Sequence, residues 1–129
     1  MPLNIDYMTK KFDLDLDFGK VGEMYIESVF EGDGKIEVKT ERDIWKTTGN
    51  IAIEIRCNGK PSGVSTTEAH TWIHLLSYEN MIVGGFLFKV DDLKEKIRKL
   101  FDEKKANVVM GGDYNASQMV LLPIKELFI

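Results

Sequence analysis

Two stretches decide the fold: Lys35-Ile36-Glu37-Val38-Lys39-Thr40 and Asn50-Ile51-Ala52-Ile53-Glu54-Ile55-Arg56. In both stretches apolar and polar side chains alternate with a period of two, which is typical of β-strands that have one buried face. The β-branched isoleucines, valine and threonine also favour extended backbone. We therefore predict a β-strand at each stretch.

The alternation also assigns the polar side chains to faces. Glu37 and Lys39 share the polar face of the first strand, and Ala52, Glu54 and Arg56 share that of the second. The polar segment 41–49, which ends at a glycine, is predicted to be a loop, so the two strands are expected to pair in the antiparallel direction. Glu37 and Glu54 would then lie opposite each other, an arrangement that is unfavourable unless a cation lies between them.

Outside these strands, changes of period and turn residues predict the other elements. They are a strand over 12–18, a helix from Gly19 that Gly32-Asp33-Gly34 ends, a turn at 58–63, a short helix at 65–69, strands at 72–76 and 86–88, a helix over 91–105, strands at 107–110 and 119–122 around a turn at 111–115, and a helical turn after Pro123. Together they predict an α/β (α+β) fold with a mixed, largely antiparallel central sheet flanked by helices.

Composition limits the class of protein. A chain of 129 residues with 43% hydrophobic side chains suffices for one domain, 1–129, with its own core. The single cysteine excludes an internal disulfide framework and fits a reducing compartment. No apolar run is long enough for a membrane span, and residues 1–6 lack the layout of a signal peptide. We therefore expect a cytoplasmic protein with no membrane partner.

Charge is distributed unevenly along the chain. The net charge of −4 argues against a protein that coats nucleic acid by bulk attraction, but residues 35–60 carry six basic and four acidic side chains. Scatter on a solvated surface would explain the same numbers. If the excess is functional, Arg42, Lys46, Arg56 and Lys60 are the candidate DNA contacts, and binding would weaken with salt.

The strand residues suggest a metal site. Carboxylates such as Glu37 and Glu54 suit Mg²⁺, which prefers oxygen ligands and keeps several waters. Lys39 could orient or help deprotonate one such water and offset charge on a phosphate. The alternative for Glu37 and Lys39 is an exposed ion pair, which contributes less than about 1 kcal/mol.

Three segments together resemble the PD-(D/E)XK nuclease superfamily, especially small phage and bacterial members related to Holliday junction resolvases. Gly19-Lys20-Val21-Gly22-Glu23 is similar to the G-x-x-G-E start of that family's first helix, and Ile36-Glu37-Val38-Lys39-Thr40 to its (D/E)-x-K strand. Residues 48–54 and 60–69 resemble the T-G-N…I-E…P-S-G…T-T-x-A block of the phage-type group. The resemblance spans roughly residues 19–76, with a weaker likeness at 121–124.

This resemblance implies a restriction-endonuclease-like core and a Mg²⁺-dependent endodeoxyribonuclease, with Mn²⁺ as a substitute, that cuts DNA, at branched junctions in some members. Its implied site is Glu37, Lys39 and Glu54, with Glu23 as a supporting ligand. The family's metal-binding aspartate usually precedes the (D/E)-x-K strand, and here Asp33 precedes Glu37 by only four residues. Either Asp33 serves from the turn, or Glu37 is the first acid.

The same resemblance implies a homodimer for symmetric cleavage of a junction, in a bacterial or phage-infected bacterial cell. Two other readings stay open: a noncatalytic DNA-binding or assembly protein that retains the fold, and a hydrolase of small phosphate esters. Ser62 is expected to cap a helix or to hydrogen-bond a phosphate. His70 and His74 are read as surface or partly buried side chains rather than zinc ligands.

Overall fold

A computed structural model of the chain describes residues 18–30 and 34–128. The chain divides into two compact units, residues 1–34 and 35–129. In the first unit, residues 18–30 form the helix predicted from Gly19 onward. The strand predicted over 12–18 lies outside the described residues, except for Phe18, which is helical. Among the described residues, no helix is both long and apolar enough to cross a bilayer.

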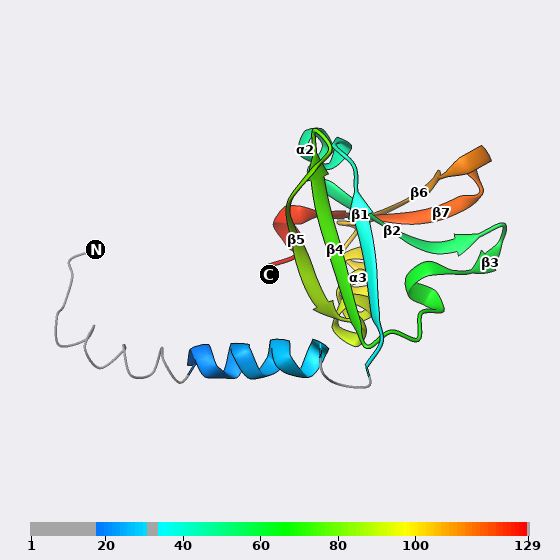
Figure 1. Cartoon of the computed structure of the whole chain (residues 1–129). Coiled ribbons are helices and arrows are strands. Elements are labelled where there is room, and N and C mark those ends of the chain that lie inside the picture. Colours follow the sequence, from blue (N-terminus) through cyan, green and yellow to red (C-terminus); the bar gives the residue numbers. More distant parts are fainter. Residues whose placement is uncertain (1–17, 31–33, 129) are drawn as a thin grey trace. The chain divides into compact units, whose positions relative to one another are not determined.

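The second unit contains two β-sheets and has the predicted α+β class (Figure 1). A three-stranded sheet has the order β1-β4-β5, in which β1 and β4 are parallel and β4 and β5 antiparallel. A four-stranded antiparallel sheet has the order β3-β2-β7-β6. The strands are β1 (Ile36–Glu41), β2 (Asn50–Cys57), β3 (Lys60–Pro61), β4 (Thr71–Tyr78), β5 (Met81–Lys89), β6 (Asn107–Gly111) and β7 (Ser117–Pro123).

The predicted antiparallel pair of the two deciding strands is wrong. Residues 36–41 and 50–57 do form strands, but β1 pairs with β4 and β2 pairs with β7 and β3, so the two belong to different sheets. The segment between them is not a hairpin loop, because it contains the short helix α2 (Ile44–Thr48). Gly49 ends α2 with φ 73°, and its N–H donates to the carbonyl of Trp45.

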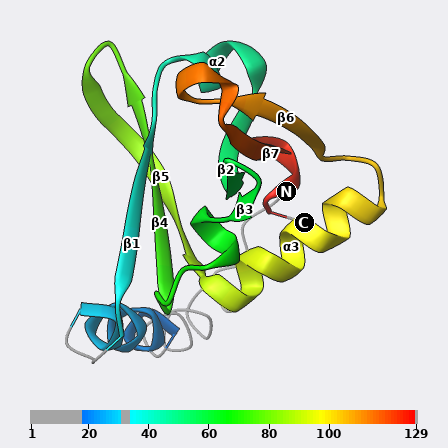
Figure 2. The same cartoon turned by 90° about the vertical axis from the view of Figure 1, so that its right-hand side faces the viewer.

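Helix α3 (Val90–Asp102) joins the end of β5 to the start of β6 and so connects the two sheets (Figure 2). Leu93 and Leu100 are almost fully buried, as the helical spacing predicts. The helix ends before the predicted residue 105 because Lys104 adopts φ 60°. The N–H of Lys105 then donates to the carbonyl of Leu100 at 2.8 Å, which closes the last turn.

Three 3₁₀ turns complete the unit, at Gly63–Ser65, Asp113–Asn115 and Ile124–Glu126. The last one follows Pro123 as predicted. The short helix predicted at 65–69 is wrong, because helical structure stops at Ser65. Thr67 is one cause, since its hydroxyl accepts a hydrogen bond from the N–H of Ala69 at 3.1 Å and competes with the backbone acceptors of a helix.

One hydrophobic core serves both sheets. It combines residues of β2 and β7 with residues of β4 and α3, and its almost fully buried members are Ile51, Ile53, Trp72, Leu93 and Leu122. Burying side chains of this size stabilises the fold by about 1.5–3 kcal/mol each. The isoleucines of β2 therefore face the core, and the opposite face of β2 is available for polar residues.

Candidate functional site

Strand β1 presents Glu37, Lys39 and Glu41 on one face, as its alternation requires. These residues pair in register with Trp72, His74 and Leu76 of β4, which are buried. Lys39 Nζ lies 3.4 Å from Glu37 Oε1, and both side chains are partly exposed. The ion pair that the sequence left as an alternative reading is therefore present, and it lies on the polar face of β1.

A pocket of about 240 Å³ brings β1 and β4 together with β2 and β7. Lys39 comes from the first sheet and Glu54 from the second, and both line it. Glu37 does not line the pocket, whereas Glu41 does. The full lining is Lys39, Thr40, Glu41, Ala52, Glu54, Trp72, His74 and Met119.

Glu54 is held by its neighbours in the second sheet. Its Oε1 accepts a hydrogen bond from the hydroxyl of Ser117 at 2.6 Å. Gly63 packs directly on its backbone, because a Cβ added at Gly63 would lie 2.1 Å from the carbonyl oxygen of Glu54. Among the described residues, no donor bonds to the second carboxylate oxygen, Oε2.

The predicted common face of Glu54 and Arg56 is wrong, because the register with β7 shifts between these two residues. Glu54 pairs with Met119, whereas Arg56 pairs with Gln118, the neighbouring residue of β7. Since adjacent residues of a strand point to opposite faces, Glu54 and Arg56 lie on opposite faces of the sheet. Arg56 therefore does not share the pocket face.

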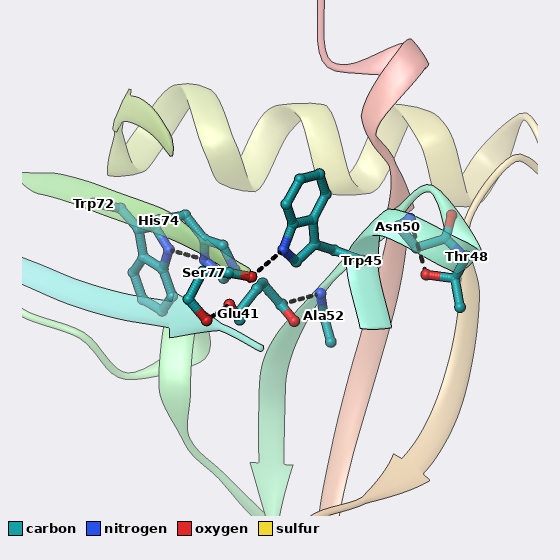
Figure 3. Close-up of polar contacts among 8 residues, drawn as sticks. All are labelled: Glu41, Trp45, Thr48, Asn50, Ala52, Trp72, His74 and Ser77. Carbon is teal, nitrogen blue, oxygen red and sulfur yellow. Dashed lines mark hydrogen bonds and ion pairs between the residues drawn. The ribbon is translucent and has the colours of Figure 1, made fainter. Parts of the chain in front are cut away.

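A chain of hydrogen bonds links three strands beside the pocket (Figure 3). The indole N–H of Trp72 donates to His74 Nδ1 at 3.1 Å. His74 Nε2 lies 2.9 Å from Glu41 Oε1, and the same oxygen accepts the backbone N–H of Ala52 in β2. His74 is 3% exposed and Glu41 13% exposed. Glu41 thus connects the two sheets through a buried polar contact.

The other two predicted metal ligands, Glu23 and Asp33, belong to the first unit of the chain. Asp33 lies outside the described residues, and Glu23 is exposed in the helix of residues 18–30, in the other unit. Across the described residues no group of three or more His, Cys, Asp or Glu side chains is arranged to hold a metal ion. An ion at the pocket would therefore be held by fewer than three described side chains of these types.

The predicted DNA contacts occur at the two ends of β2. Arg42 and Lys46 belong to the segment before it, and Lys46 Nζ lies 3.8 Å from the centre of the Tyr78 ring. Arg56 and Lys60 are exposed on β2 and β3 at the other end. A strand of this length spans roughly 25 Å, so the four basic side chains form two separate groups.

Ser62 is the remaining predicted DNA contact, and it was expected to cap a helix or to hydrogen-bond a phosphate. Its hydroxyl oxygen is buried and makes no hydrogen bond with any described residue. It makes no capping hydrogen bond with the 3₁₀ turn that follows it.

Sequence reasoning missed Glu41 and set His74 aside. Glu41 was detectable in part, because the alternation of Glu37 and Lys39 continues to Glu41, which was assigned to the loop. The contact with His74 had no sequence signal, since it depends on the parallel pairing of β1 with β4.

Comparison with protein-family models, with curated proteins and with solved structures finds no match to this chain.

Proposed function

We propose that the chain is a magnesium-dependent endodeoxyribonuclease whose catalytic centre is the pocket lined by Lys39 and Glu54. One observation carries the proposal: two sheets bring a lysine ammonium group and a carboxylate to the same pocket. Both residue types can serve the hydrolysis of a phosphodiester, the lysine by orienting water or offsetting phosphate charge and the carboxylate by binding a cation. The resemblance of residues 19–76 to PD-(D/E)XK nucleases supports the same chemistry.

The donor set fits a magnesium ion better than a metal that needs a complete protein cage. Mg²⁺ is usually held by one or two carboxylates, with waters and substrate phosphates as the other ligands. Glu54 offers Oε2, to which no described residue donates, at a pocket that would accept such an ion. When bound, Mg²⁺ would supply Lewis acidity at the scissile phosphate.

Lys39 has the freedom that the proposal needs. Its side chain is 49% exposed, and its Nζ lies 3.4 Å from Glu37 Oε1. Because an exposed ion pair of this kind is weak, Lys39 can leave Glu37 and contact a phosphate oxygen instead. Glu37 enters the proposal as the residue that holds Lys39 between encounters with DNA. Glu23 stays a supporting ligand only in the sense that the family resemblance implies.

DNA would be held by the basic groups at the two ends of β2, Arg42 with Lys46 and Arg56 with Lys60. Each phosphate contact releases counterions, so affinity would fall steeply with salt. Cleavage of a branched junction at symmetric positions would require a second copy of the chain, which makes a homodimer part of this proposal.

The test compares wild-type protein with Lys39→Ala in Mg²⁺-dependent nicking of supercoiled plasmid. We expect Lys39→Ala to lower the nicking rate about 100-fold or more, since a positioned proton-transfer group typically contributes that much. Lys35→Ala is the matched control, because Lys35 is also an exposed lysine in an ion pair, 3.1 Å from Glu68, and does not line the pocket.

Two results would contradict the proposal. One is a Lys39→Ala protein that is folded by circular dichroism and nicks at the wild-type rate. The other is wild-type protein that cuts neither supercoiled, linear nor branched DNA with Mg²⁺ or Mn²⁺.

A noncatalytic DNA-binding or assembly protein is the second candidate. The observation that favours it is that no cluster of three metal-ligating side chains exists among the described residues. A gel-shift assay separates the candidates. Equal retention of junction and duplex DNA in EDTA and in Mg²⁺, with no cleavage, would favour the second.

A further inference from the structure

Glu41 differs from Glu37, the other acid of β1, in its surroundings. It lines the pocket with Lys39 and Glu54, whereas Glu37 does not. Its side chain is 13% exposed, compared with 37% for Glu37. One of its oxygens, Oε1, accepts two hydrogen bonds, from His74 and from Ala52. Among the described residues no donor bonds to the other oxygen, Oε2.

Trp72 determines which nitrogen of His74 faces Glu41 as a donor. An indole N–H can only donate, so His74 Nδ1, at 3.1 Å, must accept and carries no proton. The imidazole proton is therefore on Nε2, which donates to Glu41 Oε1 at 2.9 Å. Because His74 is 3% exposed, water does not compete for this contact. Donors on two strands, His74 of β4 and Ala52 of β2, therefore hold the carboxylate of Glu41 in one orientation.

We propose that Glu41, and not Glu37, is the carboxylate of β1 that binds the divalent cation together with Glu54, and that His74 is its positioning residue. This inference rests on the proposed function. A carboxylate whose Oε1 is fixed by two donors has its Oε2 available, at a pocket that a second carboxylate and a lysine also line. A donor behind a metal-binding carboxylate fixes its orientation and typically changes metal affinity by about 10–100-fold.

The first experiment measures Mn²⁺ binding to the full-length protein by isothermal titration calorimetry. Glu41→Gln is the decisive variant, because its amide oxygen can still accept the hydrogen bonds from His74 and Ala52 while the negative charge is lost. We expect Glu41→Gln to weaken Mn²⁺ binding about tenfold or more. Glu37→Gln removes a charge from the same face of the same strand and is expected to bind within about twofold of wild type.

The second experiment tests the positioning role of His74 by conservative rescue. His74→Gln retains a side-chain N–H donor, whereas His74→Leu removes it and leaves Glu41 and Trp72 without this partner. We expect His74→Leu to lose about as much Mn²⁺ affinity as Glu41→Gln, and His74→Gln to recover most of it. Thermal unfolding followed by circular dichroism checks each variant. If His74→Leu does not fold, Glu41→Gln still decides the inference.

The outcomes separate the inference from the proposed function. If wild-type protein binds Mn²⁺ and Glu41→Gln binds it equally well, the inference is overturned, whether or not DNA is cut. If wild type binds Mn²⁺, Glu41→Gln does not, and no DNA is cut, the metal site stands and the nuclease proposal fails. If wild type neither binds Mn²⁺ nor cuts DNA, both are overturned.

Discussion

Gly63 lies where the backbone of one segment touches the backbone of another. It has φ 55°, a conformation that side chains other than glycine rarely adopt, and an added Cβ would lie 2.1 Å from the carbonyl oxygen of Glu54. The position of Glu54 at the pocket therefore depends on the absence of a side chain at residue 63.

Gly63→Ala is expected to lower the free energy of unfolding by about 2–4 kcal/mol, from the positive φ and the backbone clash together. Gly59→Ala is the matched control, because Gly59 also has a positive φ, 76°, but no atom within 4 Å of an added Cβ. It is expected to cost only about 1 kcal/mol. Urea denaturation measures both, and equal losses would show that the contact with Glu54 is unimportant.

Strand β5 lies close to β4 because of Gly85. A Cβ at Gly85 would lie 2.7 Å from the carbonyl oxygen of His74 and 3.1 Å from the Cα of Leu75. Gly84, its neighbour, has no atom within 4 Å of an added Cβ. The sequence predicted a strand only over 86–88, but β5 is longer and both glycines lie inside it. Gly85 is thus a site of close strand approach rather than of interruption.

Gly85→Ala is expected to lower the free energy of unfolding by about 1–3 kcal/mol, because β4 must shift to accommodate the new methyl group. Gly84→Ala is expected to change it by less than about 0.5 kcal/mol. Thermal unfolding compares the two variants. A Gly85→Ala protein as stable as Gly84→Ala would mean that the two strands separate easily at this point.

Alternation predicted where the strands are, but it could not predict how they pair. The strands at 36–41 and 50–57 follow from side-chain period, which is a local property. The parallel pairing of β1 with β4 joins residues about 35 apart, and it depends on which surfaces pack best in the completed fold. The register shift after Glu54 likewise has no sequence signal, and it reversed the predicted face of Arg56.

The candidate site, like the pairing of the strands, could be predicted only in part from the sequence. Lys39 and Glu54 line one pocket, although through packing of two sheets and not through the predicted hairpin. The predicted approach of Glu37 to Glu54 depended on the wrong pairing. Glu41 was missed because its strand was expected to end one residue earlier, so a boundary error of one position removed a pocket residue from consideration.

The shared core makes the two sheets of the second unit depend on each other. Leu122 of β7 and Trp72 of β4 belong to the same buried cluster, to which α3 also contributes. Removing core volume from one sheet should therefore weaken the other as well, because the cluster is packed as one body.

Leu122→Ala is expected to lower the free energy of unfolding by about 2–5 kcal/mol. Tryptophan fluorescence, which reports on Trp72 in the other sheet and on Trp45 of α2, and far-UV circular dichroism should give the same shifted transition. Val109→Ala, at a position on β6 that is 37% exposed, is the control with a smaller expected loss. Separate transitions by the two methods would show that the sheets unfold independently.

The bond from Trp72 to His74 has a consequence for the ligands that the proposed metal site could offer. Both imidazole nitrogens are already engaged, one as an acceptor and one as a donor, so neither has a lone pair to offer an incoming ion. Zinc and copper commonly take such nitrogens, whereas the available atoms of Glu41 and Glu54 are oxygens. If the proposed site takes an ion, the indole therefore removes the imidazole nitrogens of His74 as ligands and leaves only the carboxylate oxygens of Glu41 and Glu54.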